Sequence, residues 1–179
     1  VAQQSLTPQK GKAEWHVDVT NPAKWSAEEP NLYKVVISAS NGKQTTEAYA
    51  QRVGFRTSEI KNAQLLVNGQ PVLIKGVNRH ENNLERGHAL TREQMTKEVM
   101  LMLQGNINHV RNAHYPDAPY WYYLCDKYGI YLEDEANIES HQYYYEKESI
   151  SHPAEWCNAH VARNIEMVHA TVNHPSVCI

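Results

Sequence analysis

The segment from residue 110 to residue 141 carries side chains that could do chemistry, and they gather near its two ends. They are Arg111 and His114 in the first group and Glu133, Asp134, Glu135, Glu139 and His141 in the second. A mostly apolar stretch separates the groups, whereas a surface helix would spread its charges along one face. Carboxylates and imidazoles serve as general acids, general bases and metal ligands. The pattern predicts two strand ends that direct such groups to one place.

Strands and helices must alternate to position these groups. Apolar runs and helical spacing predict strands at 73–77, 109–113, 130–135 and 176–179 and helices at 91–106, 118–129 and 153–174. Thr91 and Gln94 form a capping box, and Gly129 suits the exit of the second helix. The third helix has an apolar stripe of Cys157, Val161, Ile165, Val168 and Val172. This alternation predicts parallel strands joined by crossover helices.

Each polar group follows one of the predicted strands. His80 follows the first strand, His114 follows the second, and residues 134–141 follow the third. The carboxyl ends of parallel strands carry the active site in a (β/α)₈ barrel and the ligand in a doubly wound sheet. No glycine-rich phosphate loop follows any of these strands, which disfavours the nucleotide-binding alternative. Four strands make half a barrel and leave an apolar edge, so we expect the chain to be part of a longer protein.

The first third of the chain predicts β structure. Apolar and polar residues alternate over 15–19 and 33–39, and Asn41-Gly42 is a two-residue hairpin signal before the returning strand. A second Asn-Gly pair, Asn68-Gly69, predicts another hairpin. These strands are too few to close a sandwich by themselves. We place a domain boundary between residues 57 and 58.

Composition excludes several classes of protein. The 179 residues include 17 basic and 20 acidic residues, a net charge of −3, which gives no electrostatic footprint for nucleic acid. No apolar run approaches a membrane span, and the start of the chain lacks the pattern of a signal peptide. Cys125, Cys157 and Cys178 are few and widely spaced, so we expect three reduced thiols in the core rather than disulfides or a zinc site.

Several of these motifs also carry a resemblance. "NHVRNAHYP" and "YWYYLCDKYGIYLEDEANIESH" resemble the family 2 glycoside hydrolases, and "DEANIESH" resembles their β-galactosidase branch. "NPAKWSAEEPNLY", "VGFR", "LLVNGQPVLIKGVNRHE" and "NHPSV" match in the same order. The resemblance covers the chain from Trp15 onward. It implies that residues 1–57 are the C-terminal part of an immunoglobulin-like β-sandwich and residues 58–179 the N-terminal half of a (β/α)₈ TIM barrel.

The resemblance also implies roles for individual residues. Glu139 and His141 match magnesium ligands, with sodium as an alternative cation. Without the family, Glu-x-His supplies too few ligands for a closed site and fits an ordinary ion pair equally well. His80 and His114 match sugar-binding positions, although a lone histidine is more often structural. Arg111 matches the arginine that holds the carboxylate of the nucleophile.

The implied activity is retaining hydrolysis of terminal β-D-galactosyl residues, which requires two carboxyl groups about 5–5.5 Å apart. Glu133, Asp134 and Glu135 are not that pair, because next neighbours on a strand are roughly 6.5–7 Å apart. The resemblance places both catalytic carboxylates beyond Ile179, so we expect this chain alone to be inactive. A carbohydrate-binding or adaptor module and a metal-dependent amidohydrolase are the alternatives, although only one histidine follows the first barrel strand.

The expected partners are a β-galactoside, the rest of the same polypeptide and, in the full enzyme, identical subunits. The compartment stays open between the bacterial cytoplasm and the periplasm. The chain departs from the family at two points. Glu133 stands where the family has an apolar residue, and Gln142 replaces a glycine before the unusual loop "YYYEKES". A buried carboxylate needs a partner, and two arrangements of Glu133 stay open: a two-hydrogen-bond pair with Arg111 on the adjacent strand, or an outward position in which it meets a helix Lys or Arg, or water.

Overall fold

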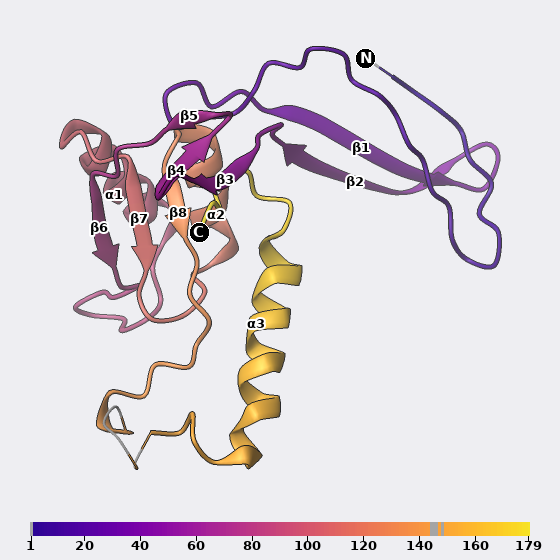
Figure 1. Cartoon of the computed structure of the whole chain (residues 1–179). Helices are drawn as coiled ribbons and strands as arrows, with labels where there is room; N and C mark the ends of the chain where they lie inside the picture. Colours follow the sequence, from indigo (N-terminus) through magenta and orange to yellow (C-terminus); the bar gives the residue numbers. More distant parts are fainter. Residues whose placement is uncertain (1, 144–146, 148) are drawn as a thin grey trace.

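A computed structural model describes residues 2–143, 147 and 149–179 of the chain. The strands form three small sheets, and the first two α-helices lie against the third sheet, whereas the last one extends away from it (Figure 1). The first sheet pairs β1 (Tyr33–Ser40) with β2 (Thr45–Val53), and the second is a meander of β3 (Ser58–Lys61), β4 (Gln64–Val67) and β5 (Gln70–Pro71). Among the described residues, no helix combines the length and the apolar character needed to cross a membrane.

The third sheet is the part that positions the candidate site. It consists of β6 (Gly76–Arg79), β7 (His109–Asn112) and β8 (Tyr131–Glu133), all parallel, joined by α1 (Arg92–Gln104) and α2 (Pro119–Tyr128). The fourth predicted strand is reduced to a parallel bridge between Leu132 and Val177, beside a 2.8 Å hydrogen bond from Leu132 N to Ser176 O. The predicted parallel pairing through crossover helices is therefore confirmed.

Helix boundaries follow the local signals in the sequence. The capping box at Thr91 and Gln94 is present at the start of α1, and Gly129 ends α2 in the left-handed conformation at φ +77°. A Cβ atom at Gly129 would lie 2.1 Å from the carbonyl oxygen of Ala27, so glycine is required there for close approach as well as for conformation. The end of α2 is thereby held against the segment that precedes β1.

One main core lies between the sheet and its first two helices. Its buried members are Met95, Val99, Val110, Trp121, Tyr122, Leu124, Cys125, Ile130 and Leu132. Because successive side chains on a strand point to opposite faces, Val110 faces the helices whereas His109 and Arg111 face the other side of the sheet. His109 and Arg111 therefore point toward what would be the barrel interior.

A second, smaller core joins the N-terminal segment and the meander to the barrel. Trp25, Val67 and Tyr131 are buried together, and the rings of Trp25 and Tyr131 meet edge to face at 5.8 Å. The indole Nε1 of Trp25 donates a 2.8 Å hydrogen bond to the backbone oxygen of Asp126 in α2. Arg56 donates to the carbonyl oxygens of Pro175 (2.7 Å) and Val177, which ties the chain end to this core.

The carboxylate of Asp126 forms a buried network that the sequence analysis did not identify. Its Oδ1 accepts hydrogen bonds from the backbone N (3.1 Å) and the hydroxyl (2.7 Å) of Ser176, and Oδ2 lies 2.6 Å from Nδ1 of His174. Ser176 is fully buried. Three groups on the segment after α3 therefore converge on one carboxylate of α2, and this network fixes where the fourth strand begins.

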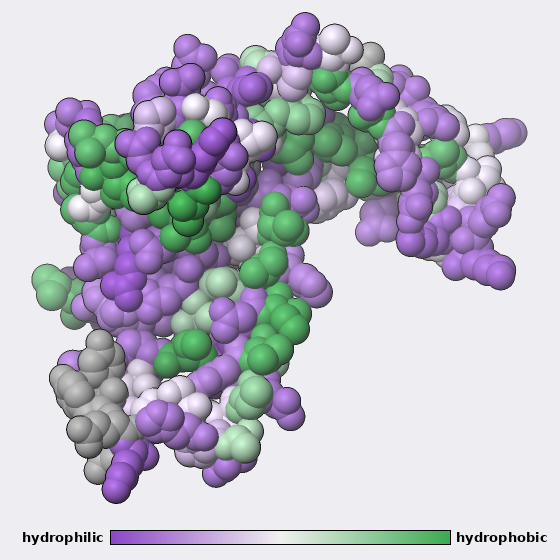
Figure 2. Space-filling view, viewed as in Figure 1, coloured by the Kyte–Doolittle hydropathy of each residue, from purple (hydrophilic) through white to green (hydrophobic). Residues whose placement is uncertain are grey.

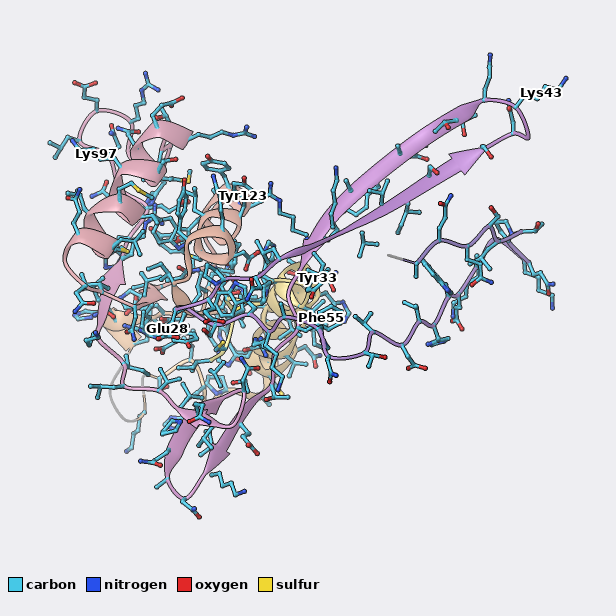
Figure 3. The ribbon with its side chains drawn as sticks, turned by 90° about the horizontal axis from the view of Figure 1, so that it is seen from above. Glu28, Tyr33, Lys43, Phe55, Lys97 and Tyr123 are labelled. Atoms are coloured by element: carbon cyan, nitrogen blue, oxygen red, sulfur yellow. The ribbon has the colours of Figure 1, made fainter. Side chains whose placement is uncertain are left out.

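The β1–β2 hairpin extends away from the barrel (Figure 1), and it is exposed along nearly its whole length. Lys43 marks its far tip, whereas Tyr33 and Phe55 pack edge to face at 5.1 Å at its base (Figure 3). Arg52 on β2 donates a 3.1 Å hydrogen bond to the hydroxyl of Tyr123 on α2. No second sheet covers this hairpin among the described residues, so it is not by itself a sandwich.

The hairpin predicted at Asn41-Gly42 is confirmed, but two local details expected for the first third are wrong. Residues 15–19 form no strand, and no strand of the described part of the chain pairs with them. The β1–β2 connection spans residues 41–44 after a register shift at Ser40, and only Gly42 takes a positive φ, +94°. By contrast, Asn68 and Gly69 both have positive φ in the predicted two-residue turn between β4 and β5.

The third helix, α3 (Cys157–Thr171), exposes the stripe that its sequence predicts to be apolar. Val161, Ile165, Val168 and Val172 are 49–67% exposed, and apolar surface runs along the helix in Figure 2. Burial of this stripe requires a partner surface that the described residues do not supply.

The expectation of three core thiols is correct only in part. All three cysteines are free, but Cys125 alone is buried, Cys178 is half-buried and Cys157 is exposed.

Candidate functional site

The candidate site is a cavity of about 770 Å³ at the carboxyl ends of β7 and β8. Its charged and histidine lining comprises Arg111, His114, Asp134, Glu135, Glu139 and His141, and α3 contributes Asn164 and Met167 to one side. Four of the five residues to which the family resemblance assigns roles therefore line one cavity. The fifth, His80, follows β6, and its ring meets that of His114 edge to face at 5.2 Å.

Glu135 joins Arg111 and His114 at the centre of the site. Its Oε1 lies 3.1 Å from Nδ1 of His114, and its Oε2 lies 2.6 Å from Nη2 of Arg111. No N–H of the guanidinium points straight at Oε2, so this second contact is an ion pair rather than an aligned hydrogen bond. Arg111 Nη2 also lies 3.1 Å from His114 Nδ1, which closes a triangle of three side chains.

The predicted pairing of Glu133 with Arg111 is wrong in its geometry. Arg111 Nε lies 3.8 Å from Glu133 Oε1, an ion pair beyond hydrogen-bond distance, and the close partner of Arg111 is Glu135. The second contact of Glu133 is His109, whose Nε2 lies 3.8 Å from its Oε2. Burial lowers the pKa of His109, and Glu133 opposes that shift. His109 is therefore uncharged at neutral pH, and the positive partner of Glu133 is Arg111.

Gly76 makes room for the ring of His109. The two residues face each other in the β6–β7 register, and a Cβ atom at Gly76 would lie 2.5 Å from Nδ1 of His109. The bulky imidazole thus occupies space that the neighbouring strand leaves empty. Glu133 and His109 together make the interior of this sheet more polar than an ordinary barrel core, which branched apolar residues dominate.

Asp134 is held in place by a chain of hydrogen bonds that was not predicted from the sequence. Its Oδ1 accepts from the hydroxyl of Tyr122 (2.7 Å) and from Nδ2 of Asn112 (3.2 Å). The Asn112 amide oxygen in turn accepts from the indole Nε1 of Trp121 at 3.0 Å. Burial, followed by the charge of Asp134, raises the pKa of the Tyr122 hydroxyl well above its usual value, so it remains a donor. Asp134 is therefore fixed at the edge of the cavity.

A buried arginine beside the site carries a second network that sequence reasoning missed. Arg79, at the end of β6, is only 5% exposed. Its Nη1 lies 2.6 Å from Asp117 Oδ2, and its Nε donates to Glu98 Oε2 at 2.8 Å. Glu81 is 3.5 Å from Nη1, and the guanidinium stacks on the ring of Trp121 at 3.7 Å. One cation therefore faces three carboxylates, and their only signal in the sequence is their residue type.

We expect Asp117 to make stability depend on pH. Burial, opposed by Arg79, raises its pKa from 3.8 to about 7. Between these values the folded chain keeps a proton that the unfolded chain releases, so this group lowers stability by up to about 1.4 kcal/mol per pH unit as pH rises. Asp117→Asn should flatten the dependence of the unfolding free energy on pH between 4 and 7, measured by urea denaturation. The exposed Asp18→Asn is the control, and equal slopes in both variants would contradict the assignment.

Glu139 and His141, the expected metal ligands, lie close to each other at the edge of the cavity. Glu139 Oε1 lies 3.9 Å from Nδ1 of His141 and accepts a 2.7 Å hydrogen bond from the backbone N of His141. Both residues line the cavity, so a carboxylate and an imidazole are available on one side of it. No cluster of three acidic, histidine or cysteine side chains suited to a metal occurs within the described ranges. These two residues fit two positions of a magnesium shell, and the remaining ligands would come from water or other residues.

The loop that departs from the family pattern is described only in part. A short 3₁₀ turn, η1 (His141–Tyr143), follows the candidate ligands, and a second one, η3 (Ala154–Trp156), precedes α3. Most of "YYYEKES", namely residues 144–146 and 148, lies outside the described residues. The expected difference in the course of this loop therefore stays a prediction.

A half-barrel with imidazole, guanidinium and carboxylate groups at the carboxyl ends of its strands defines the class, a (β/α)₈-barrel protein with a site for a polar ligand. Comparison with known families agrees. The TIM barrel domain of glycosyl hydrolases family 2 matches residues 58–179, and a second model, glycosyl hydrolases family 2, matches residues 1–56. The chain belongs to glycosyl hydrolases family 2.

Individual relatives are consistent with this assignment. The chain is 46% identical over 173 residues to a β-galactosidase of Psychromonas ingrahamii, covering 96% of this chain and 17% of that protein. A β-galactosidase of Photobacterium profundum is 48% identical over 162 residues, covering 90% and 16%. A β-glucuronidase structure from Ruminococcus gnavus with D-glucuronic acid aligns with a TM-score of 0.76 and 28% identity, covering 89% and 26%. The chain thus spans about a sixth of the length of these two β-galactosidases.

Proposed function

We propose that the chain forms part of a retaining β-galactosidase that hydrolyses terminal β-D-galactosyl residues. The observation that carries this proposal is the placement of Arg111 and His114 side by side in one cavity at the carboxyl end of β7, with His80 against His114. The names of the relatives support the galactoside over other sugars. No observation supports a separate carbohydrate-binding or adaptor module, or an amidohydrolase.

In this proposal the chain binds and orients the sugar, and two carboxylates from elsewhere in the protein carry out the chemistry. His80 and His114 contact hydroxyl groups of the galactosyl ring. Arg111 holds the carboxylate of the nucleophile, and Glu135 and Glu133 keep its guanidinium at the end of β7. A preceding immunoglobulin-like sandwich in residues 1–57, the barrel half in residues 58–179 and a homo-oligomeric full enzyme are parts of the same proposal.

Hydrolysis assays test this proposal directly. The complete protein should release nitrophenol from nitrophenyl β-galactoside, and NMR should show the β-anomer of galactose as the first product. The 179-residue chain alone should show no turnover, because both catalytic carboxylates lie outside it. Preference for a β-glucuronide, or the α-anomer as first product, would overturn the galactosidase or the retaining assignment respectively.

We also propose that Glu139 and His141 hold Mg²⁺, with Na⁺ as an alternative cation. A bound divalent cation would supply positive charge beside the sugar. Glu139→Gln removes one anionic ligand, so the complete protein should require a several-fold higher magnesium concentration for half-maximal activity. Glu155→Gln on the exposed η3 turn is the matched control. An unchanged magnesium titration in Glu139→Gln would remove Glu139 from the metal site.

A further inference from the structure

Glu135 has a place in the site that none of the roles above explains. It is half-buried after β8, and its two carboxylate oxygens are divided between His114 and Arg111. Nδ1 of His114 is also 3.1 Å from Nη2 of Arg111, so that nitrogen faces two different groups at hydrogen-bond distance. One of these groups can only accept a hydrogen bond and the other can only donate one.

The position of the proton on neutral His114 decides which contact is favourable. With the proton on Nδ1, the ring donates to Glu135 Oε1, and the charge of Arg111 still rests against Oε2 at 2.6 Å. With the proton on Nε2, the lone pair of Nδ1 accepts from Arg111 but faces the carboxylate oxygen 3.1 Å away. Each arrangement leaves one contact unfavourable, because the first sets the Nδ1 proton against an N–H of Arg111 and the second sets a lone pair against a carboxylate. The first keeps a charge-assisted hydrogen bond to Glu135 together with the ion pair between Glu135 and Arg111.

We propose that Glu135 is a positioning residue that keeps the proton of neutral His114 on Nδ1 and leaves Nε2 to accept a hydrogen bond from a substrate hydroxyl. In a neutral histidine, the hydrogen bond made by one ring nitrogen sets where the proton lies. It thereby decides whether the other nitrogen donates or accepts a hydrogen bond toward a ligand. His114 lines the cavity, and its ring is further held by the edge-to-face contact with His80. The inference rests on the proposed function only in taking that hydroxyl to belong to a sugar.

Nitrogen NMR of the chain labelled with ¹⁵N-histidine tests the proposal at pH 8, where an ordinary histidine is neutral. The His114 signals, identified by their loss in His114→Gln, should show about a tenfold excess of the form protonated on Nδ1. Glu135→Leu should reverse the preference, because Arg111 is then the remaining partner of Nδ1. A majority of the Nε2-protonated form in the unaltered chain, or an unchanged ratio in Glu135→Leu, would overturn it.

Two further variants keep the test decisive. Glu135→Gln preserves the shape of the side chain and removes its charge, so it should lower the Nδ1 excess several-fold even if the leucine variant does not fold, and an unchanged ratio would overturn the proposal. Glu133→Gln is the control, because Glu133 contacts Arg111 and His109 but not His114. It should leave the tautomer ratio unchanged, and a shift equal to that of Glu135→Gln would refute a specific role for Glu135.

Kinetics of the complete protein separate this inference from the proposed function. Glu135→Leu should lower kcat/KM for nitrophenyl β-galactoside by at least about tenfold, the effect expected when one hydrogen-bond acceptor for the substrate becomes a donor. If the unaltered protein hydrolyses no galactoside, the proposed function fails while the NMR result still decides the role of Glu135. A normal kcat/KM in Glu135→Leu with a reversed tautomer would overturn the functional part of the inference.

Discussion

Replacing Arg79 by methionine should destabilise the chain by about 3–5 kcal/mol at pH 8. The guanidinium is buried and is the nearest cation to Asp117, Glu98 and Glu81. Methionine keeps much of the packing on Trp121 but leaves these carboxylates without a counter-charge in a poorly hydrated place. The free energy of unfolding, measured by urea titration with tryptophan fluorescence, should show this loss.

The dependence of that loss on pH distinguishes charge from packing. Below pH 7 Asp117 is already protonated beside Arg79, so the penalty of Arg79→Met should shrink as pH falls. The control is Arg92→Met, which removes an arginine that stacks on Tyr120 at 4.9 Å on the exposed side of α1 and should cost less than about 1 kcal/mol. A penalty that is equal at pH 5 and pH 8 would show that packing on Trp121 dominates.

Replacing Asp126 by alanine should cost about 3–5 kcal/mol. The change leaves the backbone N and hydroxyl of Ser176 and the ring of His174 without their common acceptor, and each buried polar group left unpaired costs about 1–3 kcal/mol. Because Ser176 donates from the start of the fourth strand, the segment after α3 should lose protection against amide hydrogen exchange before the rest of the fold.

Asp18→Ala is the control for Asp126→Ala, because Asp18 is exposed in the N-terminal segment. Its effect should stay within about 0.5 kcal/mol. The double variant Asp126→Ala, Ser176→Ala should be only slightly less stable than Asp126→Ala alone. The second change removes the Ser176 hydroxyl that Asp126→Ala leaves unpaired. Full additivity of the two single effects would show that these residues act independently.

The barrel half was predictable because its signals are local. Helical spacing, the capping box at Thr91 and the glycine at the end of α2 each act within one turn of chain, so α1 and α2 appear at the predicted places. The cluster of Arg111, His114, Glu139 and His141 also followed, because the carboxyl ends of parallel strands necessarily meet at one edge.

What could not be predicted depends on which surfaces meet. Alternation at 15–19 resembles a strand, but a strand needs a neighbour, and the stripe on α3 is core only where something covers it. Adjacent strands bring both Glu133 and Glu135 near Arg111, and the spacing alone does not say which carboxylate comes within 2.6 Å. The Arg79 network joins residues that are far apart in sequence and share no motif.

The empty space at Gly76 has a consequence for the order in which this sheet can evolve. Any residue other than glycine at position 76 would place its Cβ atom 2.5 Å from the imidazole of His109. A lineage can therefore gain a side chain at position 76 only after position 109 has lost its ring, and it can regain the ring only after reverting to glycine. Among homologues, an aromatic or imidazole ring at position 109 and a side chain at position 76 should therefore not occur together, so the two positions should co-vary.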